Sequence, residues 1–521
     1  MSAGPDSTPA PGAEAGRAAA PPPRRSRRRT ARSFRSALGW TVLGTLLPGT
    51  AFLVAGRRVL GACTLLFFLL LAGGGAWLAL GGGQEAAIRT ALDTGALLWV
   101  LGGVVVVALI WITVVVAGYR MLVPADTSRS RRVAGGLVVA ALVACIAVPA
   151  VMMGQAASAQ RDLIAEVFDG GDSATVVDTP DPFGSKERVN VLLLGGDGGE
   201  GRDGVRTDTV IIASIDTATG DTTLFSLPRN LEELPFPEDS PLAEVYPDGF
   251  WAGTESESLL NAVYRNGPAD HPDILGPTDN PGADFLKLGV GEALGLKLDY
   301  YVLVNLDGFS RLVDALGGIT VNVNYYVPIN GDPGTRELPD DYIAPGPDQH
   351  MDGFTALQFA RGRFGLTDND RMARQRCTIG AIIDAAHPGT VLRKYQELAS
   401  TTKDIVSTDI PRSALDDFVE LGFLVKDAEI RSVVFDESLI DPAYPDYDQM
   451  RTLVELALDP PSAPAPDDSP EPVESTDTPP ATEETPPPAQ NPITEVGDAC
   501  AYDAAQAEEA RAKGEPPTRR R

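Results

Sequence analysis

Charged side chains flank three short apolar segments between residues 188 and 229. Asp197 follows the first segment, Arg206 and Asp208 come just before or at the head of the second, and Arg229 follows the third. The length and composition of these segments predict strands at residues 189–194, 209–215 and 222–227. Strand ends are where α/β sheets usually bind ligands. Because magnesium prefers carboxylate oxygens and guanidiniums bind phosphate, we predict a phosphate site in which Asp197 and Asp208 hold Mg²⁺ or Mn²⁺.

A second group of arginines lies in the segment DGFTALQFARGRFGLTDNDRMARQ, residues 352–375. One helix is predicted to end near Ala360, and another to begin near Asp368, which we expect to be its N-cap. Gln375 closes the segment, after four arginines in fourteen positions: Arg361, Arg363, Arg371 and Arg374. Positions 371, 374 and 375 are neighbours on a helix. Surface ion pairs are the simpler interpretation in an acidic protein, but the clustering favours bidentate binding of phosphate.

Other catalytic motifs do not account for these residues. The glycines at 196, 198 and 201 match the spacing of a dinucleotide fingerprint, but no helix is predicted directly after them to face a pyrophosphate. The sequence has no Gly-x-Ser-x-Gly elbow, no Walker loop and no metal-spaced set of Cys and His. Its three histidines, His271, His350 and His387, lie outside the charged motifs. A covalent nucleophile is therefore not indicated.

Charge divides the chain into two unlike parts. Up to Gln155 there are 15 Lys and Arg against 5 Asp and Glu, and the remaining 366 residues hold 28 against 66. The net charge is therefore about +10 before this point and about −38 after it, which together give the −28 of the whole chain. The basic part suits an anionic membrane surface. The acidic part argues against nucleic acid, which requires a basic face.

The basic part contains a membrane region, which we place at residues 37–154. Residues 1–36 hold an arginine cluster among Pro, Ala and Ser and predict a disordered cytoplasmic tail. Three stretches are apolar and long enough to span a bilayer: residues 59–80, 95–118 and 133–153. A fourth run, 38–54, is shorter and broken by Pro48-Gly49. It either lies at the interface or re-enters, or it forms a fourth span.

The arginines favour three spans. Three crossings place the following on the cytoplasmic side: the tail, Arg57, Arg58, Arg120, Arg129, Arg131 and Arg132. Four crossings would place the Arg129 cluster outside, against the positive-inside rule. We therefore expect a multi-pass protein whose acidic part lies outside the cell. In that compartment Cys377 and Cys500 could form a disulfide, although two unpaired thiols remain the alternative, and Cys63 and Cys145 lie in apolar runs.

The acidic part is predicted to contain one α/β domain. Residues 155–186 are a polar linker, 187–459 the domain, 460–493 a disordered Pro-rich acidic stalk, and 494–521 a tail without an assigned function. Strands and helices alternate, with further strands at 300–304, 319–323 and 430–435. Helices are predicted at 255–265, 283–294, 307–316, 352–360, 370–386, 391–404, 411–425 and 446–458.

The motifs together resemble those of the LytR-CpsA-Psr family, whose members attach glycopolymers to the bacterial cell wall. The resemblance covers about residues 187–388 and rests on VLLLGGD, RTDT at 206–209, SLPR, LNAVY at 260–264, DYYVLVNLDGFSRLVDALGGITVNV from 299, ALQFARGR and DNDRMARQR. It implies an α/β domain with a central mixed sheet flanked by helices. A polyprenyl pyrophosphate would bind there, with its lipid tail in a long apolar pocket.

The resemblance also implies a role for each charged residue. Asp197 and Asp208 match the family's magnesium ligands, and the expected catalytic set is Arg206, Arg229, Arg361, Arg363 and Asp368. The expected substrate-binding set is Arg371, Arg374, Gln375 and Asn261. Two departures stand out: Asn230 replaces a frequent Asp that could fix Arg229, and Leu259 replaces a frequent phosphate-facing Lys.

These observations lead to a functional hypothesis. We expect a membrane-anchored phosphotransferase that moves a glycopolymer from a polyprenyl-pyrophosphate carrier to a sugar hydroxyl of peptidoglycan, and that could also act as a pyrophosphatase. The Ala-, Gly-, Arg- and Pro-rich composition looks actinobacterial, which would suit arabinogalactan or another secondary wall polymer. The alternative is a non-catalytic module that binds lipid-linked polymer or tethers the wall. A membrane-bound transcriptional attenuator is a weaker third hypothesis, because the acidic domain lacks a basic face.

Overall fold

The computed structural model describes residues 31–77, 94–167, 172–177, 179, 181–197, 205–386, 406–459 and 492–519. These residues fall into two compact units. One comprises Met1–Gly75 with Val104–Ala150, and the other Ala76–Gly103 with Val151–Arg521. The predicted helix at 391–404 and most of the predicted tail and stalk lie outside the described residues.

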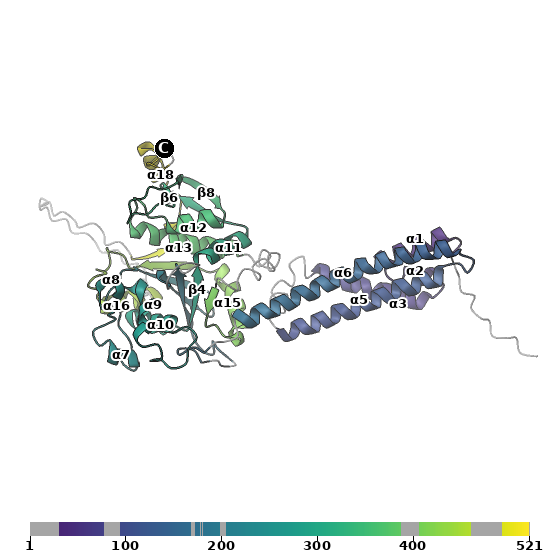
Figure 1. Cartoon of the computed structure of the whole chain (residues 1–521), viewed down its shortest axis with the longest axis horizontal. Coiled ribbons are helices and arrows are strands. Elements are labelled where there is room, and N and C mark those ends of the chain that lie inside the picture. Colours follow the sequence, from purple (N-terminus) through teal and green to yellow (C-terminus); the bar gives the residue numbers. More distant parts are fainter. Residues whose placement is uncertain are drawn as a thin grey trace, which may run out of the picture. The chain divides into compact units, whose positions relative to one another are not determined.

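The first unit is built from apolar helices, which Figure 1 shows as long coiled ribbons. The helices concerned are α1 (Phe34–Leu46), α2 (Thr50–Val54), α3 (Arg58–Trp77), α5 (Thr94–Leu122) and α6 (Arg129–Val167). Three helical segments are long and apolar enough to cross a membrane: Arg58–Trp77, Gly95–Leu122 and Arg129–Ser158. Their large apolar side chains are mostly exposed, as expected where lipid replaces water.

The broken run at 38–54 forms two short helices rather than one continuous span. The chain turns at Gly49, whose φ is 106°, and a Cβ there would lie 2.4 Å from the Gly61 carbonyl oxygen, so only glycine fits. Helix α1 begins at Phe34, inside the segment predicted to be a disordered tail. Helix α6 continues to Val167, well past the predicted start of the linker at residue 155.

The second unit contains a seven-stranded mixed sheet, in the order β11-β10-β3-β2-β1-β4-β9 (Figure 1). The β1–β4 and β3–β10 pairs are parallel, and the other pairs are antiparallel. The strands are β1 (Arg188–Gly196), β2 (Thr207–Asp216), β3 (Thr222–Leu227), β4 (Tyr300–Asn305), β9 (Val406–Thr408), β10 (Ile430–Val434) and β11 (Ile493–Glu495).

Helices cover both faces of this sheet because its central strands are apolar on both sides. On β2, Val210 and Ile212 belong to a core shared with α9 (Leu260–Asp270), α10 (Pro281–Leu294) and α16 (Tyr447–Leu458). The alternate residues Ile211 and Ala213 pack on the other face, where Ile379 of α13 (Asp368–Ala385) and Val496 contact them. The predicted fold class, α/β with a central mixed sheet flanked by helices, is confirmed.

A smaller layer follows β4 and supplies the second arginine group. Helix α11 (Leu306–Leu316) leads into β5 (Ile319–Val323), β6 (Val327–Ile329), β7 (Asp341–Ile343), β8 (Gly346–Met351) and α12 (Gly353–Arg361). Strand β5 pairs with β8, and β6 with β7. A separate apolar core, which includes Val313, Val321 and Phe359, joins these elements to α13. The layer therefore holds α12 and α13, and the loop between them, against the main sheet.

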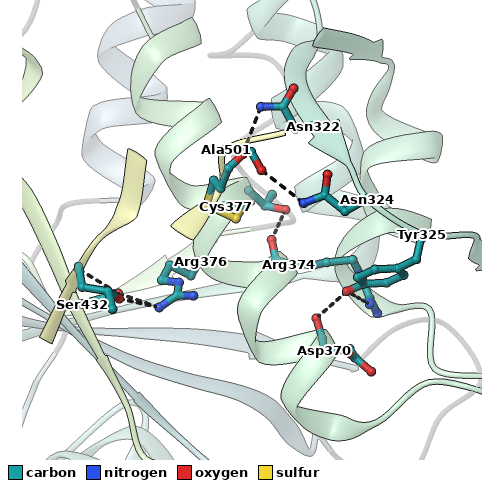
Figure 2. Close-up of a disulfide and its surroundings, with 12 residues drawn as sticks. Asn322, Asn324, Tyr325, Asp370, Arg374, Arg376, Cys377, Ser432 and Ala501 are labelled. Atoms are coloured by element: carbon teal, nitrogen blue, oxygen red, sulfur yellow. Dashed lines mark hydrogen bonds between the residues drawn. A yellow bond between two sulfur atoms is a disulfide. The ribbon is translucent and has the colours of Figure 1, made fainter. Parts of the chain in front are cut away.

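The C-terminal segment completes the sheet and is covalently tied to α13. Strand β11 pairs with β10, and α17 (Val496–Ala499) leads to a disulfide between Cys377 and Cys500, whose Cα atoms are 5.5 Å apart. Asn322 donates to the Cys500 carbonyl at 3.0 Å, and Arg376 donates to Ser432 at 2.8 Å (Figure 2). The disulfide left open by the sequence is thus present, and α18 (Ala504–Lys513) follows it.

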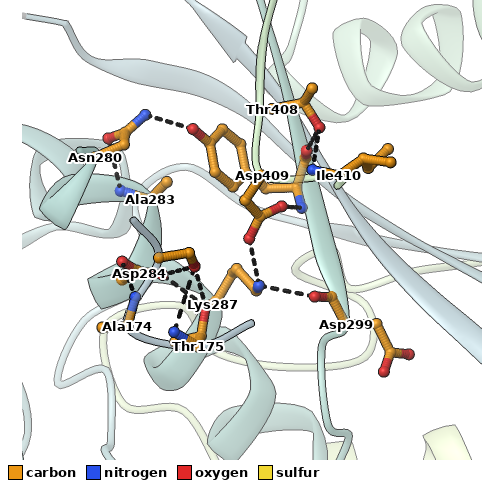
Figure 3. Close-up of polar contacts among 12 residues, drawn as sticks. Ala174, Thr175, Asn280, Ala283, Asp284, Lys287, Asp299, Thr408, Asp409 and Ile410 are labelled. Atoms are coloured by element: carbon orange, nitrogen blue, oxygen red, sulfur yellow. Dashed lines mark hydrogen bonds and ion pairs between the residues drawn. The ribbon is translucent and has the colours of Figure 1, made fainter. Parts of the chain in front are cut away.

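A buried ion pair fixes the opposite edge of the sheet. Lys287 of α10, whose side chain is 1% exposed, lies 2.6 Å from the Asp409 carboxylate, which also accepts from the Tyr301 amide (Figure 3). Asp284, one turn earlier, accepts hydrogen bonds from Ser173 and Thr175 before β1. Partnered in this way, the charges join α10, β4 and the segment after β9 without leaving an isolated buried charge.

Several local predictions were wrong in detail. The helix predicted at 255–265 is two helices, α8 (Glu255–Ser258) and α9, because the backbone is extended at Leu259. The helix predicted at 411–425 begins as a 3₁₀ turn, Arg412–Ala414, before α15 (Leu415–Lys426). The N-cap of α13 is Thr367, which forms a capping box with Asp370, and Asp368 is instead the first helical residue. A short helix, α7 (Pro241–Val245), and the three-residue strands were not predicted.

Candidate functional site

Strand register brings the first group of charged residues to one edge of the sheet. Gly196 at the end of β1 is paired with Thr207 at the start of β2, and Leu227 at the end of β3 is paired with Val210. Asp197, Arg206, Asp208 and Arg229 therefore emerge together, as predicted. The Arg206 amide donates to the Asp197 carboxylate at 2.8 Å, and this contact closes the ends of the described chain on either side of residues 198–204.

An apolar cavity of about 340 Å³ opens at this edge of the sheet. Its walls come from β1, β2, β4, α11, α12 and α13, and they include Leu193, Ile211, Val302, Phe309, Leu312, Leu357, Ile379, Ile382 and Ile383. Six of the predicted site residues also line it: Asp197, Asp208, Arg361, Arg363, Arg371 and Gln375. The cavity thus combines hydrocarbon walls with a charged group of side chains, a lining suited to an amphipathic ligand with an anionic head.

Asp368 lies at the centre of the arginines. Its carboxylate accepts from Arg371 at 2.8 Å, and the nitrogen–oxygen distances to Arg229 and Arg363 are 3.6 and 3.8 Å. Three guanidiniums converge on one carboxylate, so the cluster keeps excess positive charge. Burial, followed by the charges of Arg229 and Arg371, lowers the pKa of Arg363 below its ordinary value. An anionic ligand would relieve this repulsion.

Asp208 connects the two charged groups. Arg229 donates to its carboxylate at 3.1 Å and Asn261 donates to the same oxygen at 3.2 Å, while Arg371 donates to its backbone carbonyl at 2.6 Å. Burial alone would raise the pKa of Asp208, but the charge of Arg229 and the Asn261 hydrogen bond outweigh it, so the pKa lies below its ordinary value of 3.8. The carboxylate is therefore ionised at neutral pH.

Helix α13 presents Arg371 and Gln375 to the cavity. Arg371 is 3% exposed, and Gln375 donates to the Thr209 hydroxyl at 2.8 Å. Both side chains are held by contacts with the head of β2, so they are oriented before any ligand binds.

Arg374 does not belong to the substrate-binding set. It is 3% exposed, its Nε donates to the Phe359 carbonyl at 2.6 Å, and a terminal nitrogen donates to the Gly362 carbonyl. The other terminal nitrogen donates to the Tyr325 hydroxyl at 3.0 Å (Figure 2). These acceptors satisfy the guanidinium inside the protein. Arg374 instead fixes the backbone on both sides of Arg361.

Asn261 and Arg206 also differ from their predicted roles. Asn261 is 4% exposed and is absent from the cavity lining, so it orients Asp208 rather than contacting a ligand. Arg206 points its side chain to Glu257, at 2.7 Å, and does not line the cavity. Arg229 is likewise outside the lining, but it contacts Asp208 and Asp368, which hold it beside the arginine cluster.

Sequence reasoning missed Glu257 and most of the cavity wall. Glu257 accepts from Arg206 and Arg265 and from the Asn266 amide, which is the first cause that lowers its pKa. Arg265 directly follows the LNAVY motif, which was its only local signal. The apolar lining of α11 and α13 could have been suspected from their amphipathic patterns, but not its position beside β1.

The carboxylates could hold a divalent ion only with help from a ligand. Among the residues that the structure describes, no group of three or more His, Cys, Asp or Glu is arranged to hold a metal. Asp197 and Asp208 both line the cavity. Two carboxylates fit magnesium, which keeps several waters and completes its shell with substrate phosphate oxygens.

Comparisons with known proteins agree with the arrangement. A model of the LytR_cpsA_psr family matches residues 154–442. Biofilm regulatory protein A of Streptococcus mutans is 26% identical over 240 residues, which cover 45% of this chain and 53% of that protein. A polyisoprenyl-teichoic acid–peptidoglycan teichoic acid transferase TagU of Enterococcus faecalis is 29% identical, over 43% of this chain and 63% of its own.

Two further similarities complete the comparison. The probable cell wall biosynthesis protein LcpB of Corynebacterium glutamicum is 30% identical over 41% of each chain. Among solved structures, Bacillus subtilis TagV is 23% identical with a TM-score of 0.35, covering 52% of this chain and 96% of that one. TagT bound to LIIa-WTA is 19% identical with a TM-score of 0.35, covering 56% and 96%. The chain spans less than two thirds of the length of the first two curated relatives.

Proposed function

The chain belongs to the LytR_cpsA_psr family, and from this premise we propose that it is a membrane-anchored phosphotransferase. It would transfer a glycopolymer from a polyprenyl-pyrophosphate carrier to a sugar hydroxyl of peptidoglycan. The observation that carries the proposal is the apolar cavity whose lining includes Asp208, Arg361, Arg363 and Arg371. The name of the TagU relative, a polyisoprenyl-linked polymer transferase, supports this substrate class.

The cavity separates the two halves of such a substrate by polarity. The polyprenyl chain would pack against the apolar side chains of α11, α12 and α13, where its burial is favoured by the hydrophobic effect. The pyrophosphate would meet Arg361, Arg363 and Arg371, whose planar forks pair with phosphate oxygens. Arg229 adds positive charge from outside the lining, held there by Asp208 and Asp368.

The transfer is a displacement at phosphorus. A peptidoglycan hydroxyl oxygen forms a new bond to the phosphorus that carries the glycopolymer, and the bond from this phosphorus to the bridging oxygen breaks. Its electron pair stays on the departing polyprenyl phosphate, which also takes up the hydroxyl proton. The guanidiniums stabilise the charge that moves to the bridging oxygen, and such positioning and electrostatics supply most of the rate in phosphoryl transfer. With water as the acceptor, the same step would be a pyrophosphatase reaction.

Magnesium or manganese would be held by Asp197 and Asp208 and, when bound, would neutralise charge on the pyrophosphate oxygens. Asn261 keeps the Asp208 carboxylate in place through its amide at 3.2 Å. The low pKa of Asp208 keeps this carboxylate ionised, as metal binding requires. Both features serve the same position.

Catalysis is favoured over a purely binding role by the surroundings of Arg229. The sequence departure at Asn230 removes a carboxylate that could have fixed this arginine, yet Asp208 and Asp368 contact it at 3.1 and 3.6 Å. Near the second departure, Leu259, two arginines meet at Glu257. The charged network is thus complete without the residues that the sequence lacks.

We further propose that the protein is multi-pass, with the sheet domain outside the cytoplasm. Three helices are long and apolar enough to cross a membrane, and the arginines near their ends favour a cytoplasmic location by the positive-inside rule. The family's acceptor, peptidoglycan, would then lie on the same side as the site. A protease added to intact spheroplasts should cut the domain in the region of residues 460–491.

The proposal is tested with the full chain in detergent micelles, magnesium, a polyprenyl-pyrophosphate-linked oligosaccharide and soluble peptidoglycan fragments. Formation of a phosphodiester-linked product is expected. Leu312→Trp should fill the apolar cavity and reduce turnover of a long-chain donor at least about tenfold, since one lost apolar group of this size is worth about 1.5–3 kcal/mol.

The same substitution at Leu456, an exposed residue of α16 outside the cavity, is the matched control and should have no effect. Lack of turnover by the wild-type chain would reject the enzymatic function. Equal turnover by both tryptophan variants would reject the assignment of the lipid to this cavity.

A further inference from the structure

A second cavity, of about 520 Å³, adjoins the arginines from the smaller layer. In contrast to the apolar cavity, its lining is mostly polar: Asn330, Gly331, Asp332, Pro333, Glu337, Asp340, Gln358, Arg361, Gly362, Arg363 and Arg519. Arg361 and Arg363 therefore line both cavities. A ligand in the polar cavity would lie next to the pyrophosphate that these arginines are proposed to bind.

The end of α12 separates the two cavities. Leu357 and Ala360 line the apolar cavity, whereas Gln358 and Gly362 line the polar one. This division follows from helical geometry, because residues three apart share a face and a residue one position along is turned by about 100°. Arg361 ends the helix and is the residue through which both faces meet.

Gln358 provides a hydrogen-bond donor that the protein itself does not use. It is 5% exposed, and its Oε1 accepts from the Asn330 amide at 2.9 Å. Within the described part of the chain, its Nε2 has no acceptor, although the residue lines the cavity. A side-chain amide that is this buried is normally satisfied on both ends. The unused donor indicates a hydrogen-bonding ligand.

The loop that forms the far wall is held in a defined shape. Asp332 and Glu337 form a two-way backbone bridge at 2.9 Å, and Asn330 donates to the Asp340 carboxylate at 2.8 Å. Arg519, from the segment beyond the disulfide, donates to the Leu338 carbonyl at 2.7 Å and pairs with Glu337 at 2.6 Å. The C-terminal segment, for which the sequence suggested no role, thus supplies one wall of this cavity.

We propose that the polar cavity binds the acceptor sugar, a neutral glycan with free hydroxyls, and this rests on the proposed phosphotransferase function. Its carboxylates, Asp332, Glu337 and Asp340, can accept from hydroxyls but would repel a second phosphate. The amide of Gln358 and the guanidinium of Arg519 can donate to hydroxyl and acetamido oxygens. Side chains of both kinds are what a carbohydrate requires.

The reaction geometry favours the acceptor over the sugar of the donor. In phosphoryl transfer the attacking and leaving oxygens lie roughly in line through the phosphorus. The leaving polyprenyl phosphate occupies the apolar cavity, so the attacking hydroxyl must come from another side of the shared arginines. The polar cavity meets this condition, because Arg361 and Arg363 also line it and it offers no apolar wall to the lipid.

Calorimetric titration of the full chain in nanodiscs tests the inference. The acceptor probe is a tetrasaccharide of alternating N-acetylglucosamine and N-acetylmuramic acid, and the donor probe is a short-chain polyprenyl pyrophosphate. Gln358→Met should raise the dissociation constant of the tetrasaccharide about threefold to tenfold, the factor for one lost hydrogen bond. Arg519→Ala, at a side chain that is 40% exposed and so tolerant of change, should have a similar effect. Donor binding should stay within about twofold of wild type.

The matched control is Gln349→Met. The Gln349 amide donates to the Ala344 and Gly346 carbonyls outside the cavity, so this variant should bind both probes as the wild type does. Unchanged tetrasaccharide binding in Gln358→Met and Arg519→Ala, or loss of donor binding instead, would overturn the assignment. A wild-type chain that binds both probes but forms no phosphodiester would reject the transferase function and leave the glycan site supported.

Discussion

Separate roles for the carboxylates and the arginines are the most informative property to test. We compare Asp208→Asn, which removes one proposed metal ligand, with Arg361→Ala, which removes one proposed head-group donor. The asparagine keeps the shape of the side chain and can still accept from Asn261. It weakens the contact between Asp208 and Arg229, whose side chains are 39% and 32% exposed.

The expected magnitudes differ because the two contacts differ in kind. A partly exposed ion pair contributes up to about 1 kcal/mol, so the loss of Asp208's charge should change metal-free lipid binding by no more than about fivefold. Arg229 also keeps Asp368 at 3.6 Å. A charge-assisted hydrogen bond to phosphate is worth about 1.5–3 kcal/mol, so Arg361→Ala should weaken lipid binding roughly 10- to 150-fold, with or without metal.

Magnesium and lipid should also bind cooperatively, each raising the affinity for the other by a factor of about 5–150. Asp208→Asn should abolish this enhancement, and Arg361→Ala should retain it. Titration of a short-chain polyprenyl pyrophosphate into both variants, with magnesium and with chelator, measures all four affinities. If the two variants lose metal-free binding to the same extent, the proposed separation of roles is wrong.

Three further predictions concern the support of the site. Arg374→Met should lower the stability by about 3 kcal/mol or more and also reduce turnover, because three hydrogen bonds of a buried guanidinium are lost beside Arg361; a variant that unfolds more readily but turns over normally would contradict its positioning role. Replacing Cys377 and Cys500 by alanine opens a loop of 123 residues and should lower stability by up to about 5 kcal/mol in thermal unfolding, the chain-entropy value, and an unchanged melting temperature would show that the disulfide is dispensable. The pKa of Asp208 is lowered in the folded protein, so its charge stabilises the fold at pH values above the ordinary 3.8 and this contribution is lost as the pH falls through the folded-state value; the stability difference between wild type and Asp208→Asn should therefore shrink below about pH 4, and a difference that grows there would reverse the sign.

The sequence by itself determined the elements and the edge at which the chemistry lies. Strand β3 and strand β5 have the predicted bounds, and β1, β2 and β4 differ by one to three residues at each end. These segments were predictable because period and β-branched content are local properties of the chain. Consecutive antiparallel strands then place Asp197, Asp208 and Arg229 at one edge, whatever else the chain does.

Short elements and caps were harder to predict. The three-residue strands β6, β7, β9 and β11 carry too few residues for a pattern, and they exist because neighbouring strands offer backbone partners. At the start of α13, both Thr367 and Asp368 are suitable N-caps by residue type. The choice of Thr367 is confirmed only by the reciprocal bonds to Asp370.

Only the tertiary structure decided which charged residues face the cavity. Arg371 and Arg374 are three residues apart on one helix, yet one lines the cavity and the other turns to the Phe359 and Gly362 carbonyls. Likewise Asn261 reaches Asp208 from 53 positions away, and Arg519 joins a wall formed by a loop about 180 positions earlier. A side chain's residue type fixes what it can bind. Its partner is fixed by long-range packing, which no local pattern of a single sequence contains.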